Sequence, residues 1–221
     1  MIYVYGITDA TEPPDRRGLR DARLSVIRES GLGAVVSVHE SLELEAEEDE
    51  LWAHEAVVEA LMERGPVLPM RIGSAAADPA AVVSLLRDRS AEFRRTLERV
   101  RGAVEVGVRA APRNPSAEKA PAPALAGAAG PGTEYMLARL SEKTRDDEAA
   151  AQIHAALRPL ARSHTSPTGS AGSGPARAAY LVDRERVDEF AGRVDELQRD
   201  LDWSIVCTGP WPPYSFTEEP G

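Results

Sequence analysis

The order of apolar and polar residues in the first hundred positions predicts strands followed by helices. Residues 2–7 are mostly β-branched or aromatic, which is typical of a strand. Two short apolar runs, 24–28 and 34–38, flank a glycine-containing turn and predict a hairpin. The run 67–72 predicts a strand that is bent or lies at a sheet edge, because Pro69 has no N–H to donate.

Two helices are predicted in the same part of the chain. The first covers about residues 49–64, begins at an acidic stretch and ends at Gly65-Pro66. The second begins at Asp78-Pro79, with aspartate as the cap, and continues as one long helix to about Arg101. Apolar residues at helical spacing predict the buried faces: Leu51, His54, Val58, Leu61 and Met62 in the first helix, and Val82, Leu86, Phe93, Leu97 and Val100 in the second.

The second half of the chain predicts the element order βαββαβ. Residues 102–109 alternate between apolar and polar side chains with a period of two, which indicates a half-buried strand. Asp183 is predicted to cap an amphipathic helix with Val187, Phe190, Val194, Leu197 and Leu201 on one stripe. The remaining elements are a helix over 133–160, a short strand near 162–166, and strands at 177–182 and 203–207.

The protein is therefore expected to be α+β with two domains. Residues 1–101 form an N-terminal α+β domain, and residues 102–221 form a C-terminal ferredoxin-like domain with the order βαββαβ. Segments near 111–132 and 163–175 consist mainly of small residues and proline, lack apolar periodicity and predict flexible insertions. The proline-rich end, 208–216, is expected to be extended.

Composition and charge exclude several functions. The chain is 43% hydrophobic and 28% charged, which is typical of a globular protein, and its 26 Lys and Arg against 36 Asp and Glu give a net charge of −10. So acidic a chain is unsuited to nucleic acid or to an anionic membrane surface. The single Cys207 excludes an intramolecular disulfide and fits a reducing cytoplasm. The first residues lack the features of a signal peptide, and no apolar run approaches the roughly 20 residues needed to span a bilayer.

The sequence predicts no catalytic, metal or cofactor site. His54-Glu55 would suggest a zinc helix only with a second histidine four residues after the first, and that position is Val58. His54 is therefore expected to be a surface or partly buried helix residue, and Cys207 a buried structural thiol. The segment 65–73 lacks the glycine and lysine spacing of a phosphate loop; Arg71 within it is a candidate for a structural or partner ion pair.

Two stretches are candidates for binding a partner. The acidic run 43–50 is either a solvated helix start or a site for a cation or a basic partner. The end of the chain combines rigid prolines with Trp211, Tyr214 and Phe216, which suits binding because little entropy is lost and much area is buried. The same segment is also suited to cover the end of a sheet. Both functions are compatible if Trp211 lies inside and Tyr214 or Phe216 outside.

Three segments together resemble the GvpF/GvpL family of gas-vesicle proteins. They are YVYGI at 3–7, HEAVV at 54–58 with GPVLPMRIG at 65–73, and AYLV at 179–182 with TGPWPPYSF at 208–216. The resemblance spans residues 2–216, and GPWPPYSF is its most specific part. Ile72 stands where many relatives are expected to have phenylalanine.

The resemblance implies two α+β domains, the second ferredoxin-like, and a non-enzymatic role in building gas vesicles, which are hollow protein shells in the cytoplasm. It implies contacts with the small hydrophobic shell protein GvpA and with other accessory proteins, without a cofactor. We expect Trp211, Tyr214, Phe216 and Arg71, together with an exposed sheet edge, to bind the partner. The alternatives are a small-molecule-binding regulatory protein and, third, an enzyme. The resemblance does not separate F-type from L-type members, nor a shell component from an assembly factor.

Overall fold

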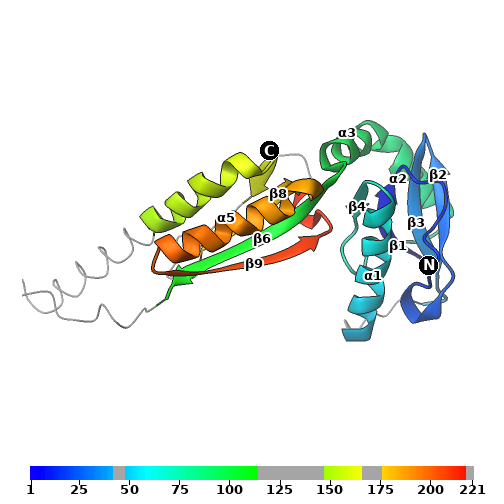
Figure 1. Ribbon diagram of the computed structural model, residues 1–221. Helices are drawn as coiled ribbons and strands as arrows, with labels where there is room; N and C mark the ends of the chain where they lie inside the picture. The colour runs from blue at the N-terminus through cyan, green and yellow to red at the C-terminus, as the bar shows by residue number, and fades with distance from the viewer. Residues whose placement is uncertain (42–47, 114–146, 166–175, 218–221) are drawn as a thin grey trace, which may run out of the picture. The chain divides into compact units, whose positions relative to one another are not determined.

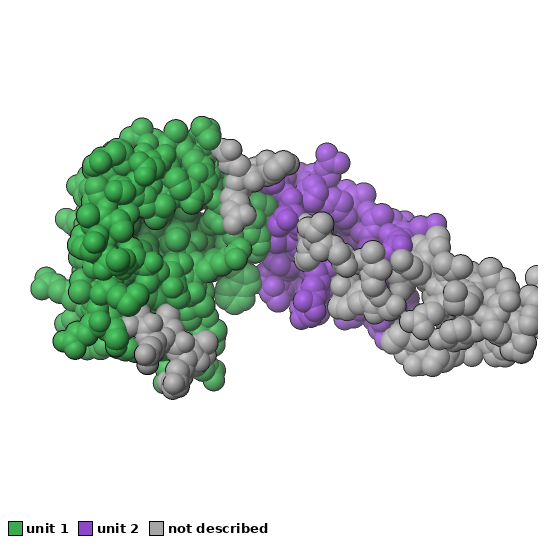
Figure 2. Space-filling view, turned by 180° about the vertical axis from the view of Figure 1, so that it is seen from behind, with its two compact units in different colours: residues 1–105, 210–221 green, residues 106–209 purple. Residues whose placement is uncertain are grey.

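The computed structural model describes two compact units in the chain. The described residues are 1–41, 48–113, 147–165 and 176–217. Unit 1 comprises Met1–Glu105 with Pro210–Gly221, and unit 2 comprises Val106–Gly209, as Figure 2 shows in two colours. The chain therefore passes from one unit to the other within two strands, β6 (Ala103–Pro112) and β9 (Trp203–Trp211). The division differs from the expected one in the C-terminal residues, which belong to unit 1.

The sheet of unit 1 is built around the N-terminal strand. Its strands are β1 (Ile2–Thr8), β2 (Ser25–Glu29), β3 (Leu32–Val38), β4 (Val67–Pro69) and β5 (Ala75–Ala76). Their order is β2-β3-β1-β4, with β5 also paired to β1, and all these pairings are antiparallel. The predicted hairpin is confirmed: β2 and β3 join through Ser30 and Gly31, both at positive φ, as a tight right-twisted hairpin requires. The strand with Pro69 is short and lies at the end of the sheet order, as expected.

Three helices pack against this sheet. They are α1 (Glu48–Arg64), α2 (Pro79–Asp88) and α3 (Ser90–Val100). Figure 1 shows α1 in front of the sheet and α2 behind it. Helices on both sides explain why all seven residues of β1 are buried and why the strand reads as a continuous apolar run rather than an alternating one.

The prediction of a single long helix over 79–101 is wrong, because the chain turns at Arg89 and forms two helices. Asp78 caps α2 as expected, its Oδ1 accepting from the N–H of Ala81 at 2.9 Å. Arg89 has φ −105° and ψ 16°, yet hydrogen bonds continue from its N–H to the Leu85 carbonyl and from Phe93 N–H to its own carbonyl. Its guanidinium bonds Glu92 and lies over the Phe93 ring, so it stabilises the first turn of α3. No glycine or proline marks this break. The predicted apolar stripe of both helices is buried.

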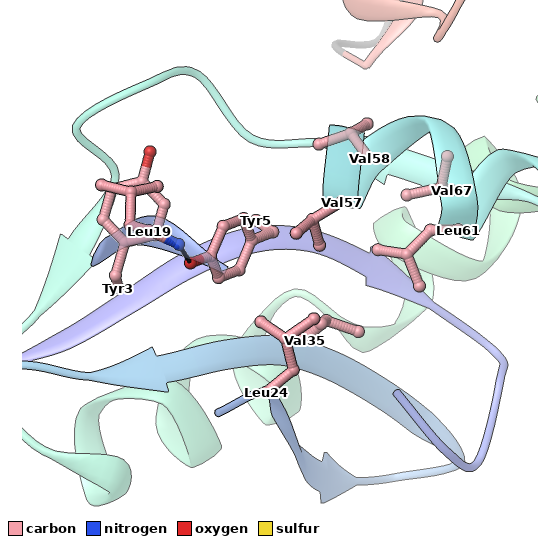
Figure 3. Packing of buried hydrophobic residues seen from close by; sticks show 9 residues of the cluster. All are labelled: Tyr3, Tyr5, Leu19, Leu24, Val35, Val57, Val58, Leu61 and Val67. Atoms are coloured by element: carbon pink, nitrogen blue, oxygen red, sulfur yellow. Dashed lines mark hydrogen bonds between the residues drawn. The ribbon is translucent and has the colours of Figure 1, made fainter. Parts of the chain in front are cut away.

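The buried face of α1 is rotated slightly from the predicted one. His54, Val57, Val58 and Leu61 are buried, whereas Leu51 is 43% exposed. Val57 fills the core in its place and belongs to the cluster that joins α1 to β1, shown in Figure 3. The cluster consists of Tyr3, Tyr5, Leu19, Leu24, Val35, Val57, Val58, Leu61 and Val67.

Unit 2 contains a four-stranded sheet with the order β7-β8-β6-β9. Its described elements run β6, a helix over 147–157, β7 (Ser163–Thr165), β8 (Ala176–Asp183), α5 (Val187–Asp200) and β9. The predicted α+β class is confirmed for the chain, and the elements follow the predicted order; the ferredoxin-like class stays a prediction. The expected strand near 162–166 is β7, and the end of β6 enters the segment predicted as the first insertion. Residues 114–146 and 166–175 lie outside the described ones.

Three local expectations for this half are wrong. Asp183 does not cap α5 with its side chain: a 3-10 turn, Arg184–Arg186, comes first, and Asp183 forms an ion pair with Arg162. Cys207 is exposed rather than buried, because it lies on the outer strand β9. The C-terminal segment is not extended throughout, since Tyr214–Phe216 form a 3-10 turn after Pro213.

The tight packing of Gly18 against Tyr5 gives a test of the unit 1 core. A Cβ at Gly18 would lie 2.2 Å from the Tyr5 hydroxyl and 2.8 Å from Leu24 Cδ2, both in the core. We expect Gly18→Ala to destabilise the protein by about 1–3 kcal/mol, because the core must shift to accept the methyl group. The measurement is denaturant unfolding. Gly192→Ala is the control: a Cβ there meets nothing within 4 Å, and an alanine within α5 should stabilise by about 0.5–1 kcal/mol. Equal effects of the two substitutions would contradict this packing.

Candidate functional site

The C-terminal segment is held against unit 1 by hydrogen bonds from side chains far away in the sequence. The Tyr214 hydroxyl donates to Glu55 Oε1 on α1 at 2.7 Å. The N–H and the hydroxyl of Ser215 donate to the two carboxylate oxygens of Glu105 on β6, each at 2.7 Å. Both acceptors are carboxylates, and charge-assisted bonds of this kind are stronger than neutral ones. The segment is therefore fixed in place.

A third anchor fixes the end of the turn. Arg99 on α3 donates from Nη2 to the carbonyl oxygen of Phe216 at 2.6 Å. The Phe216 side chain is only 5% exposed, and Pro212 and Pro213 are buried, whereas Trp211 is 44% exposed. The expected arrangement, with Trp211 inside and Tyr214 or Phe216 outside, is thus reversed. The turn at 214–216 directs Phe216 into unit 1 and leaves Trp211 at the surface.

Burial, together with the bond to Glu55, keeps the Tyr214 phenol protonated. Burial is the main cause that raises the pKa of Tyr214, and the hydrogen bond to Glu55 and the negative charges of Glu55 and Glu59 raise it further. A phenol that stays neutral remains a donor, so the anchor persists throughout the physiological pH range. Glu55 is half-buried, so its carboxylate receives part of its hydrogen bonding from Tyr214 and not from water.

The residue before Glu55 joins α1 to β1 and to the loop after β4. His54 Nε2 lies 2.9 Å from the carbonyl oxygen of Met70, so this nitrogen carries the proton. Nδ1 then accepts from the Tyr3 hydroxyl at 2.8 Å, and that hydroxyl accepts from the N–H of Gly73 at 3.3 Å. His54 is fully buried, which corrects the expectation of a surface or partly buried residue. Both ring nitrogens of this core histidine have hydrogen-bond partners, and its ring stacks on Tyr5.

Arg71 follows Met70 and lies exposed on the turn that His54 holds. Its carbonyl oxygen accepts from the N–H of Ser74 at 3.0 Å, which closes the turn. The loop with Arg71 and the anchored C-terminal segment therefore meet α1 at two consecutive residues, His54 from the inside and Glu55 from the outside. Of the four predicted site residues, the structure exposes Arg71 and Trp211, half-buries Tyr214 and buries Phe216.

Trp52 is an exposed aromatic residue that the sequence analysis missed. It is 62% exposed on α1, one turn before Glu55, and its indole N–H donates to Glu48 Oε1 at 3.3 Å. A tryptophan at a polar position of an amphipathic helix is the signal that could have found it. Leu51 lies exposed beside it in the sequence, and acidic residues are frequent along the helix: Glu48, Asp49, Glu50, Glu55, Glu59 and Glu63.

The acidic run 43–50 is described only from residue 48. Within that part, Glu50 forms an ion pair with Arg20 at 2.8 Å, so at least one carboxylate of the acidic run has a structural role. Residues 43–47 lie outside the described ones. In the part of the chain that the structure describes, no group of three or more His, Cys, Asp or Glu side chains is placed to hold a metal ion. No helix there is long and apolar enough to cross a bilayer.

The chain is similar to known proteins along nearly its whole length. The family model described as gas vesicle synthesis protein GvpL/GvpF matches residues 1–218. Gas vesicle protein L of Streptomyces sp. (strain CB03234) is 30% identical over 97% of this chain and 91% of its own length. Gas vesicle protein F of the same strain is 30% identical over 98% of this chain and 99% of its own length. The chain therefore belongs to the GvpL/GvpF family of gas vesicle synthesis proteins.

Solved structures agree with this assignment at the level of the fold. The crystal structure of GvpF from Anabaena sp. PCC7120 superposes with a TM-score of 0.82 at 20% identity, covering 100% of this chain and 99% of that one. GvpF from Microcystis aeruginosa gives 0.76 at 19% identity, covering 98% of each chain. The family gives the protein a gas vesicle-related role and an association with gas vesicles, and it is not a known enzyme family.

The anchor of the C-terminal segment can be tested by a double-mutant cycle. Tyr214→Phe removes the donor and Glu55→Ala removes the acceptor. We expect a coupling of about 1–2 kcal/mol in the free energy of unfolding, since the bond involves a charged but half-buried group. Pairing Tyr214→Phe with Glu63→Ala, an exposed residue two turns further along α1, should give additive effects. Additivity in both cycles would show that the bond does not hold the segment.

The buried His54 predicts a loss of stability in mild acid. Burial lowers the pKa of His54 below its usual value, against the opposing effect of the bond to Met70. Below about pH 6.5 the unfolded chain takes up a proton that the folded core rejects, so stability should fall as the pH drops below that value. Denaturant unfolding between pH 8 and pH 5 (about the range in which histidine titrates) measures the slope.

His54→Gln should reduce this slope, because glutamine can bond Tyr3 and Met70 without titrating. It should not abolish the slope, since burial also lowers the pKa of His39 and of His154. An unchanged slope in the variant would mean that His54 is not the group responsible.

Proposed function

We propose that this protein binds the small hydrophobic shell protein GvpA and supports the assembly of gas vesicles in the cytoplasm, without catalysis. The observation that carries the proposal is the exposure of Trp211 and Trp52 on rigidly supported segments of unit 1. Large aromatic side chains supply much contact area for little loss of conformational entropy, and they dominate the energy of many protein interfaces. The names of the two Streptomyces relatives, gas vesicle protein L and gas vesicle protein F, support a role in gas vesicles.

In this proposal the C-terminal residues have different roles. Trp211 makes the contact with the partner, and Tyr214 and Phe216 position it, because both are engaged with unit 1. Arg71 is exposed on its turn and supplies a cation for a carboxylate of the partner or of another gas vesicle accessory protein. Trp52 extends the apolar contact along α1, surrounded by carboxylates that favour a partner with basic residues beside its apolar ones.

In this proposal the exposed aromatic surface shields the apolar surface of GvpA from water. A subunit with a large apolar surface aggregates before it polymerises unless a partner covers that surface. Outer strands offer a second mode of contact, because their unpaired N–H and C=O groups can add a strand from the partner. In the described part of the chain, β2 ends the sheet order of unit 1, and β7 and β9 end that of unit 2.

Co-expression with GvpA and pull-down from the soluble fraction tests the proposal. We expect GvpA to stay soluble and to copurify with the wild-type protein, and to do so several-fold less with Trp211→Ala or Trp52→Ala. Val38→Ala is the matched control, since Val38 is an exposed apolar residue of unit 1 outside the proposed surface. Point substitutions are preferable to removal of residues 210–221, which would take away the buried Phe216 and unfold part of unit 1.

Two outcomes would count against the proposal. If GvpA does not copurify with the wild-type protein, the assembly role through direct binding is wrong. If the tagged protein is at the same time present in washed, intact vesicles, a structural role in the shell replaces it. Melting temperatures of the variants must stay at the wild-type value, so that any loss of binding reports the surface and not the fold.

A further inference from the structure

Three ring-bearing polar side chains gather at the outer edge of the unit 2 sheet. His154 comes from the helix over 147–157, His164 from β7 and Tyr180 from β8. His164 and Tyr180 are directly paired across the two antiparallel strands, so their side chains project on the same face. The centroids of the two imidazole rings are 4.3 Å apart, and the rings lie 5.8 Å and 6.3 Å from the Tyr180 ring.

Tyr180 orients one of the two histidines. Its hydroxyl lies 2.9 Å from His154 Nδ1, and the tyrosine is 1% exposed. His154 is half-buried and His164 is exposed. The inner nitrogen of His154 is therefore occupied by a buried partner, which leaves Nε2 for a ligand on the outer side, next to the accessible imidazole of His164.

We propose that His154 Nε2 and His164 together bind one divalent transition-metal ion of the Zn²⁺ class. Imidazole is a preferred ligand for Zn²⁺, Ni²⁺ and Cu²⁺. Two nitrogens that share a zinc ion lie roughly 3.4 Å apart, because bonds of about 2.1 Å meet near the tetrahedral angle. Rings already in contact reach this spacing by small side-chain rotations. In the bound form, Nδ1–H of His154 donates to the Tyr180 oxygen, the supporting bond that metal-binding histidines commonly make.

The surroundings set the strength of this site. Among the described residues no third His, Cys, Asp or Glu completes a group of ligands, so water fills the remaining positions. The positive charge of Arg158, one helical turn after His154, acts on that imidazole and opposes a cation. Removal of this charge should therefore strengthen binding, a change of opposite sign to the loss of either histidine.

Calorimetric titration of the untagged full chain with Zn²⁺ tests the site. We expect one ion per chain, with the dissociation constant raised at least about tenfold in His154→Asn and in His164→Asn, as for a lost ligand or its support. Arg158→Gln should lower it. His39→Asn is the control, because His39 is a half-buried histidine of unit 1. Thermal unfolding gives a second readout: Zn²⁺ should raise the melting temperature of the wild-type protein and of the control, and not that of the two histidine variants.

The same titration can overturn the proposal. No heat of binding with the wild-type chain at millimolar Zn²⁺ would exclude the site. Binding that is unchanged in His164→Asn would do the same, since this exposed residue can be replaced without disturbing the core. Neither outcome bears on the proposed binding of GvpA through Trp211 and Trp52, which belong to unit 1.

Discussion

The hydrogen bonds of the two tyrosines on β1 are the constraint on which the organisation of unit 1 depends. β1 is covered on both faces, so a phenol on this strand has no access to water. Each hydroxyl therefore needs a partner inside the protein, and an unmet one costs about 1–3 kcal/mol. The Tyr3 hydroxyl bonds His54. The Tyr5 hydroxyl accepts from the Leu19 N–H at 2.7 Å, a bond drawn in Figure 3, and it also bonds the Ser37 hydroxyl at 2.9 Å.

These bonds fix where α1 lies along the sheet. With His54 held between Tyr3 and the Met70 carbonyl, α1 can neither slide nor rotate without leaving polar groups unpaired. Consecutive residues of a helix point about 100° apart, so a buried His54 places Glu55 at the boundary with solvent. Glu55 is thereby in position to hold Tyr214. The placement of the C-terminal segment follows from the packing of the first strand, although more than two hundred residues separate them.

The sequence predicted those features whose cause is local. The β2–β3 hairpin, the Asp78 cap and the stripe Val82, Leu86, Phe93, Leu97 and Val100 depend on neighbours within a few residues, and each is confirmed. The break at Arg89 was missed although its partners Glu92 and Phe93 lie within four residues, because no glycine or proline marks it.

The candidate site was less predictable because the residues that anchor it are far away in the sequence. The residues Trp211, Tyr214 and Phe216 were identified from composition, but their exposure depends on Glu55, Arg99 and Glu105, between 110 and 159 positions away. Pairings over such distances are invisible to periodicity. Composition alone therefore identified the segment as a candidate and reversed the orientation of its aromatic residues.

Parts of the three segments that carry the resemblance to gas vesicle proteins meet in space within unit 1. Tyr3 belongs to the first, His54 and Glu55 to the second, and Tyr214 to the third. Tyr3 bonds His54 and Tyr214 bonds Glu55, so the three segments meet at two consecutive residues of α1. Packing is sufficient to explain why a fold of this kind needs most of these residues. It does not explain Trp211, which lies within the most specific segment yet is left at the surface by anchors on its C-terminal side. A fold does not define a function, and the proposal that a partner binds at Trp211 therefore rests on a side chain that the fold supports without burying.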